Sequence, residues 1–163
     1  MLRFHLSCHS SFQSRTDHRP GCEDDHISCY PLKWKTIYEF YEDAGVSWQV
    51  YQDKDNFDDN PLAHFEQFQN ATAGSALADK GLAYLGLEAF YNATANGTLP
   101  EVSFIVGPKE LSEHPPYMPK DGAWLQKKVV EAVVNSPKYS STLLMISYDG
   151  MLRISTTLAL SQY

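Results

Sequence analysis

The chain has 163 residues, which is about the length of one domain and enough to bury a hydrophobic core. Hydrophobic residues make up 43%, aromatic residues 13% and charged residues 20% of it, a mix that excludes a collagen, a coiled coil and a wholly disordered chain. The formal net charge of −7 argues against nonspecific nucleic-acid binding, and no apolar run reaches the roughly 18 residues of a transmembrane helix.

Residues 1–30 are polar, rich in Ser and His, and have no periodicity, so the sequence predicts loop or disorder there, with residues 1–21 either disordered or non-homologous to the rest. Cys22 and Cys29 bracket a polar loop at a spacing that one disulfide could close. A Cys/His metal site and free thiols are the alternatives. The first residues have neither the apolar core nor the cleavage site of a signal peptide, so the chain is expected either to be cytosolic or to lack its true beginning.

Between residues 36 and 69 a helix, a strand and a second helix are predicted. The first helix has apolar positions at i, i+3, i+4 and i+7 and stops at Gly45. Residues 46–51 alternate in the manner of a short strand, and Asn60 with Pro61 is typical of the start of the second helix.

The negative charge is concentrated in this stretch. Residues 36–69 hold one Lys against eight Asp and Glu, a balance of −7 that equals the whole net charge. Either a solvated acidic face or a site for a cation or substrate explains it. The acidic loop 53–60 resembles a calcium loop only in composition, because it lacks the Gly and the distal Glu of such loops.

The rest of the chain continues the alternation of helices and strands, which predicts an α/β fold with a parallel sheet. Gly81 and Gly86 weaken the first of these helices, and a long loop, LSEHPPYMPKDGAW, precedes the second. The predicted elements are a helix over 75–91, a strand over 102–106, a helix over 123–135 and a strand over 142–148.

Two candidate site residues follow predicted strands, where parallel sheets bind ligands. His114 lies in the long loop beside two prolines, which stiffen the backbone, and Asp149 ends the last strand. A histidine there suits a phosphate or a metal, and an aspartate there suits a divalent cation. An exposed loop histidine and a turn or cap aspartate are the alternatives. No common nucleophile or phosphate-loop motif is present.

Three N-glycosylation triplets lie within 29 residues, at Asn70, Asn92 and Asn96. Their clustering favours a secreted glycoprotein, and ordinary Asn and Thr turns are the alternative.

Two long runs, TIYEFYEDAGVSWQVYQDKDNFDDNPLAHFEQFQNA and VSFIVGPKELSEHPPYMPKDGAWLQKKVVEAVVNSPKYSSTLLMISYD, resemble the phosphoesterase family of non-haemolytic phospholipases C and acid phosphatases, especially its secreted fungal members. The resemblance implies an α/β/α fold like that of alkaline phosphatases, and hydrolysis of phosphoric esters, including phospholipids, beside a bound divalent metal. It also implies that His114 is a catalytic histidine that contacts the phosphate and that Asp149 is a metal ligand.

The resemblance covers residues 22–149. Residues 1–21 and 150–163 lack the family's pattern, including its second acid, its Asp-His pair and its nucleophile. The chain is therefore expected to be an internal fragment of a secreted phosphoric-ester hydrolase, inactive alone and unable to hold the metal by itself. The alternative is a non-catalytic secreted glycoprotein that uses the remaining sheet for binding or structure.

Overall fold

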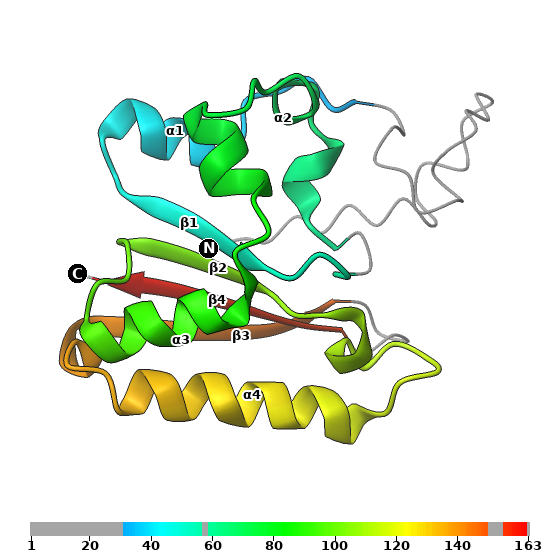
Figure 1. Ribbon diagram of the computed structural model, residues 1–163, viewed down its shortest axis with the longest axis vertical. Helices are drawn as coiled ribbons and strands as arrows, with labels where there is room; N and C mark the ends of the chain where they lie inside the picture. Colours follow the sequence, from blue (N-terminus) through cyan, green and yellow to red (C-terminus); the bar gives the residue numbers. More distant parts are fainter. Residues whose placement is uncertain (1–30, 57–58, 150–154, 163) are drawn as a thin grey trace.

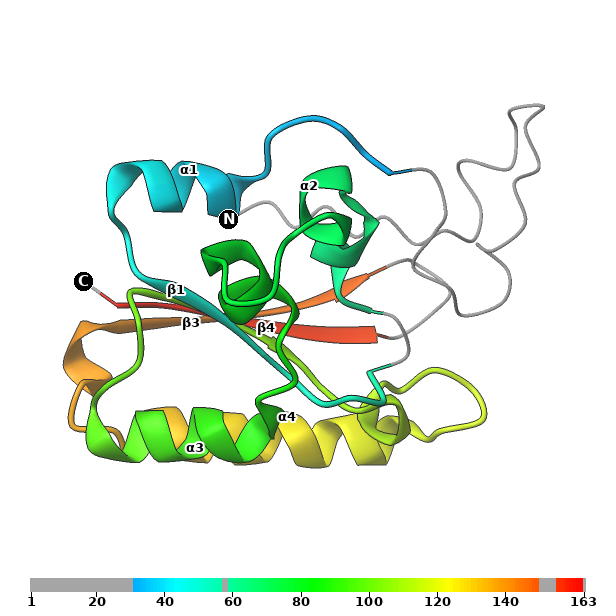
Figure 2. The same ribbon diagram turned by 45° about the horizontal axis from the view of Figure 1, so that its top comes forward.

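The computed structural model describes residues 31–56, 59–149 and 155–162. In these residues one four-stranded sheet lies between two layers of helices (Figures 1 and 2). Helices α1 and α2 lie on one side, and α3 and α4 lie on the other. This arrangement confirms the predicted α/β/α class. The bounds are α1 Ile37–Ala44, β1 Trp48–Gln52, α2 Glu66–Gln69, α3 Gly86–Asn96, β2 Val102–Val106, α4 Pro119–Val134, β3 Thr142–Asp149 and β4 Ser155–Gln162.

The sheet has the strand order β1-β2-β4-β3. Strands β1 and β2 are parallel, with Val50 opposite Phe104, as the sequence predicts. Strand β4 was not predicted, and it pairs antiparallel with both β2 and β3, so the sheet is mixed rather than wholly parallel. Because β4 is antiparallel to both neighbours, β3 runs in the same direction as β1 and β2. The carboxyl ends of these three strands therefore meet at one edge of the sheet.

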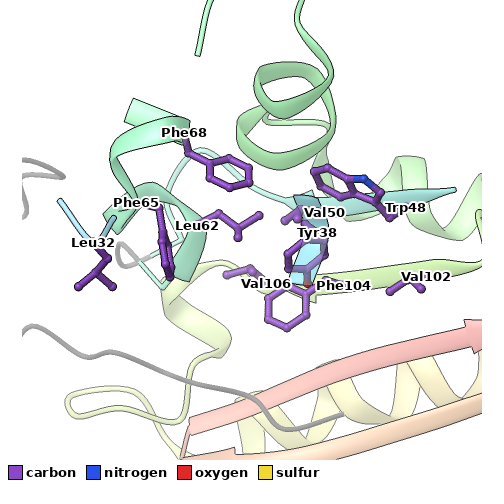
Figure 3. Packing of buried hydrophobic residues seen from close by; sticks show 10 residues of the cluster. All are labelled: Leu32, Tyr38, Trp48, Val50, Leu62, Phe65, Phe68, Val102, Phe104 and Val106. Carbon is purple, nitrogen blue, oxygen red and sulfur yellow. The ribbon is translucent and has the colours of Figure 1, made fainter. Parts of the chain in front are cut away.

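The core on the α1 side is aromatic (Figure 3). The rings of Tyr38 and Trp48 lie 4.8 Å apart, and the ring of Tyr38 meets that of Phe104 edge-on at 6.3 Å. Such tilted ring pairs add stability beyond the area that they bury. The cluster joins α1, β1 and β2 to the segment that contains α2, through Leu32, Tyr38, Trp48, Val50, Leu62, Phe65, Phe68, Val102, Phe104 and Val106.

The core on the other face packs α3 and α4 against the sheet. Phe90 of α3 and Val129 of α4 are completely buried, and the ring of Tyr51 lies 5.6 Å from that of Phe90. Leu144 of β3 is partly buried against the same cluster, so α4 contacts the edge strand directly. This cluster consists of Tyr51, Phe90, Leu99, Ile105, Leu125, Val129 and Val133.

The helix predicted after Asn60 is broken in two. A 3₁₀ turn over Pro61–His64 is capped by Asn60, and α2 begins only at Glu66. Phe65 between them is extended and forms a bridge with Leu32, whose N–H donates to the His64 carbonyl at 2.8 Å. Pairing with a distant segment thus overrides the local helical pattern.

The helix predicted over 75–91 is also divided. A single π-helical turn covers Ala78–Leu82, and α3 begins at Gly86 and ends at Asn96. Gly86 has a φ of +73°, which an L residue rarely adopts, so the break falls at this glycine. Gly81 is needed for a different reason, because a Cβ there would lie 2.7 Å from the Phe68 ring.

Candidate functional site

The predicted site residues lie along the edge where β1, β2 and β3 end. His114 lies in the loop that leads from β2 to α4, and Asp149 is the last residue of β3. The structure confirms that both follow strands that run in one direction. It describes the backbone of Asp149 but not its side chain.

The His114 loop is held by hydrogen bonds on both sides of the histidine. The His114 N–H donates to Ser112 Oγ at 3.2 Å, and the Tyr117 N–H donates to the His114 carbonyl at 2.9 Å. The His114 Nδ1 atom lies 2.8 Å from the Pro115 carbonyl oxygen. A carbonyl oxygen only accepts, so this contact makes Nδ1 the protonated nitrogen and leaves the lone pair of a neutral ring on Nε2.

Glu113 anchors the loop to α4. It has a φ of +64° although it is not a glycine, and the residue is 6% exposed. A Cβ on Gly122 would lie 2.1 Å from Glu113 Cγ, so only a glycine in α4 admits this side chain. Gln126, one turn further along α4, donates to Glu113 Oε1 at 3.3 Å. A non-glycine residue at positive φ persists only where its surroundings hold it in place.

Acidic side chains gather where β1 ends. Burial, and then the charge of Glu110, raise the pKa of Asp53 above its usual value. Burial raises the pKa of Tyr91, with smaller contributions from Glu88 and Asp53, so these groups lie near one another.

Other acids of the negative stretch have lysine partners. Lys109 Nζ lies 2.7 Å from Asp55, and the hydrogen bond and charge of Asp55 raise the pKa of this lysine. On the α1 side, Lys80 pairs with Glu42 and Lys35 pairs with Asp43. Much of the negative excess is therefore balanced locally.

A metal implied by the family would need several carboxylate or imidazole ligands. In the described ranges, no three His, Cys, Asp or Glu side chains lie close enough together to hold one. These ranges by themselves do not supply a ligand set for a divalent metal.

Three residues that sequence reasoning missed connect the two candidates. Glu113 precedes His114, Tyr148 precedes Asp149, and Gln126 hydrogen-bonds to both Glu113 and Tyr148. The available signal was Gly122, which lies just before the predicted helix in the sequence and inside α4 in the structure, one turn before Gln126. A glycine that weakens a helix is often needed for close packing.

The sequence also singled out two cysteines and three glycosylation triplets. Cys22 and Cys29 lie outside the described residues. Asn70, Asn92 and Asn96 are all exposed, Asn70 just after α2 and the other two on α3. None of the helices in the described ranges combines the length and the hydropathy that a bilayer crossing requires.

The layered fold, with three strands of one direction ending at one edge beside the hydrogen-bonded His114 loop, defines an α/β domain of the kind that usually binds ligands at such an edge. More particularly, the model of the Phosphoesterase family matches residues 7–151. The chain belongs to this family, as its sequence pattern predicts. The predicted boundaries at residues 22 and 149 stay predictions, because the structure does not describe residues 1–30 and 150–154.

Curated relatives are bacterial phospholipases C. A non-hemolytic phospholipase C of Pseudomonas aeruginosa is 39% identical over 137 residues, which cover 80% of this chain and 20% of the relative. A non-hemolytic phospholipase C of Burkholderia pseudomallei is 36% identical, with 71% and 20% covered. A hemolytic phospholipase C of Pseudomonas aeruginosa is 30% identical, with 72% and 20% covered. The chain spans about a fifth of the length of these relatives.

Proposed function

We propose that this chain is part of a phosphoric-ester hydrolase of the phospholipase C type, and that His114 contacts the phosphoryl group of its substrate. The hydrogen-bonded placement of His114 at the edge where β1, β2 and β3 end carries the proposal. Family membership and the phospholipase C relatives support the reaction class. A phospholipid or another phosphate ester is the substrate class that these relatives suggest.

An imidazole in this position has two uses in phosphoryl transfer. With both nitrogens protonated, Nε2–H donates to a phosphoryl oxygen, or passes its proton to the oxygen of the leaving group. The contact from Nδ1 to the Pro115 carbonyl fixes the ring, so Nε2 needs no reorientation before the reaction.

The proposal also covers what this chain lacks. Asp149 is one ligand of a divalent cation, and the further ligands and the nucleophile come from parts of the enzyme outside the residues that the structure describes. The chain alone is then able to bind phosphate but not to turn over an ester. A phosphodiester and a phosphomonoester assay, with and without divalent cations, tests this, and cation-dependent turnover would contradict it.

Inorganic phosphate is expected to shift the imidazole NMR signal of His114 saturably. His114→Gln identifies that signal among the six histidines and should weaken phosphate binding at least about tenfold, because a hydrogen bond to a charged group is lost. Lys127→Ala, on the exposed face of α4, is the control and should leave affinity unchanged. A His114 signal that does not respond, or equal responses of all histidines, would refute the phosphate contact.

The second candidate, a non-catalytic secreted glycoprotein, is favoured by the exposure of the three acceptor asparagines. We expect glycans on Asn70 and Asn96, which lie at helix ends, but not on Asn92. The Asn92 triplet lies within α3, and its Thr94 hydroxyl is fully buried and donates to the Phe90 carbonyl at 2.7 Å. Secretion of the chain behind an added leader in yeast, followed by glycopeptide mass spectrometry, measures occupancy.

Asn→Gln at each acceptor is the control for that experiment. Loss of two glycan masses in the Asn70→Gln, Asn96→Gln double variant is the expected result. Full occupancy of Asn92, or no glycan at all, would contradict the assignment. Secretion with glycans and without phosphate binding would favour the glycoprotein over the hydrolase.

A further inference from the structure

We propose that Gln126 is a positioning residue that couples the His114 loop to the carboxyl end of β3. The coupling runs from Glu113 through the Gln126 amide to Tyr148, and we call these three side chains the Glu113–Gln126–Tyr148 bridge. The inference rests on the proposed function of His114. It adds an explanation of how the distance between His114 and the carboxyl end of β3 is maintained.

The first part of the bridge ties the loop to α4. Glu113 is nearly completely buried, whereas most carboxylates in the described ranges are exposed or paired with lysine, and it directly precedes His114. Its side chain fills the space over Gly122, where a Cβ would lie only 2.2 Å from Oε1. A buried carboxylate is costly unless it receives hydrogen bonds. The Gln126 amide supplies one of them at 3.3 Å.

The second part ties α4 to β3. The Nε2 atom of Gln126 lies 2.5 Å from the Tyr148 hydroxyl oxygen. An amide nitrogen carries two hydrogens, so it donates to Glu113 and to Tyr148 at the same time. Gln126 thereby spans the gap between two segments that are 35 positions apart in sequence.

The position of the bridge matters because β3 is held on one side only. Among the described strands, β3 pairs with β4 and has no partner on its other edge. The bridge holds β3 one residue before Asp149, at the point where the strand leaves the sheet. Leu144, on the same strand, is the other side chain that packs toward the α4 cluster.

The consequence for function is geometric. Two groups that act on one phosphoryl group must be spaced to within about an ångström, and small misplacements cost on the order of a hundredfold in rate. Neither His114 nor Asp149 is fixed by its own element alone, because one lies in a loop and the other ends an edge strand. The bridge provides one rigid element, α4, to which both are attached.

The test measures the affinity of this chain for inorganic phosphate through the His114 NMR signal. Gln126→Leu should weaken binding about tenfold, because it removes both hydrogen bonds while keeping the apolar volume. Tyr148→Phe removes only the hydroxyl and should weaken binding about threefold, in the same direction. Tyr139→Phe is the matched control, since Tyr139 and Tyr148 are 53% and 54% exposed, and should change nothing.

Exchanging the side chains at positions 113 and 126 shows whether Gln126 positions the His114 loop or only packs against it. Gln126→Glu alone should impair binding, because it faces Glu113 with a second carboxylate. Combining it with Glu113→Gln restores one donor and one acceptor, and Tyr148 can then donate to the carboxylate at position 126. The double variant should recover phosphate affinity to within about threefold of the wild type. No recovery in a folded double variant would overturn the proposal.

A second readout does not need phosphate. Tyr148→Phe should shift the His114 ring signal and speed the hydrogen exchange of the Tyr117 amide, which donates to the His114 carbonyl. If wild type fails to bind phosphate but Tyr148→Phe still changes these signals, the proposed function fails and the coupling stands. If phosphate binds and neither Gln126→Leu nor Tyr148→Phe alters its affinity or these signals, the coupling is wrong and the proposed function stands.

Discussion

Gly122→Ala is expected to lower the free energy of unfolding by about 1–3 kcal/mol, the usual cost of overpacking. In an ordinary helix interior the same change stabilises by about 1 kcal/mol, because alanine is the better helix former. Here the new Cβ would lie within 2.1 to 2.5 Å of three atoms of Glu113, so the buried side chain must leave its place. Urea unfolding followed by circular dichroism measures the loss.

A double-mutant cycle identifies the cause. Glu113→Ala removes the atoms that clash, so Gly122→Ala should cost less in that background than in the wild type. Ala123→Gly, at the exposed neighbouring position, controls for helix propensity and should cost up to about 1 kcal/mol. A Gly122→Ala variant as stable as the wild type would show that the side chain of Glu113 does not lie against α4.

The second large effect concerns the outer edge of β3, where we expect the chain to self-associate. No charge interrupts Thr142 to Tyr148, and unprotected edge strands pair with other chains. The exposed apolar side chains are Leu143, Met145, Ile146 and Tyr148. At tens of micromolar, light scattering after size exclusion should give a mass well above 18.4 kDa, and Met145→Lys should restore the monomer.

The opposite edge of the sheet provides a comparison within the molecule. On β1, the Gln49 and Gln52 side chains donate to backbone carbonyls of residues 79–83. These hydrogen bonds hold the segment 79–83 against β1, so this edge strand is covered. Val134→Lys, which places the same charge on an exposed apolar position of α4, is the matched control and should leave association unchanged. A wild-type chain that stays monomeric at high concentration would contradict the edge-pairing prediction.

The sequence correctly predicted the helices and strands that are set by local contacts or by their own amino-acid composition. The run Val102–Val106 is β2 exactly as its apolar composition predicts, and the last predicted strand is β3 with one more residue. Helix α1 follows its apolar spacing and ends where Gly45 adopts a φ of +69°. Thr36 and Glu39 form a capping box at its start, which reinforces the same boundary.

Three predicted boundaries differ from the structure, and the first of these differences has a long-range cause. Phe65 leaves the helical conformation because it pairs with Leu32, more than 30 positions away. The break before α3 depends on the backbone at Gly86, which the sequence marks only as a weak point. Helix α4 begins at Pro119 instead of residue 123, since a proline in the first turn is favourable and the loop before it is correspondingly shorter.

The candidate site likewise contains residues that the sequence predicted and residues that it did not. His114 and Asp149 were found from their places after strands and from the family resemblance, and both do follow strands of one direction. Glu113 and Gln126 were not found, because the available signal, Gly122, lies just before the predicted helix, and a buried carboxylate at positive φ has no sequence pattern of its own. Their contact exists only once α4 lies beside the loop.

The insertion of β4 between β2 and β3 has a consequence for the order of events during synthesis. When β3 has left the ribosome but residues 155–162 have not, β3 has no strand neighbour among those in the final sheet order. The pairing of β3 with β4 is local in sequence and so forms quickly, whereas its docking against β2 closes a long loop. The nascent chain therefore exposes the edge of β2 until the β3–β4 hairpin has formed and docked. In this interval the chain is most prone to aggregation, which chaperones prevent.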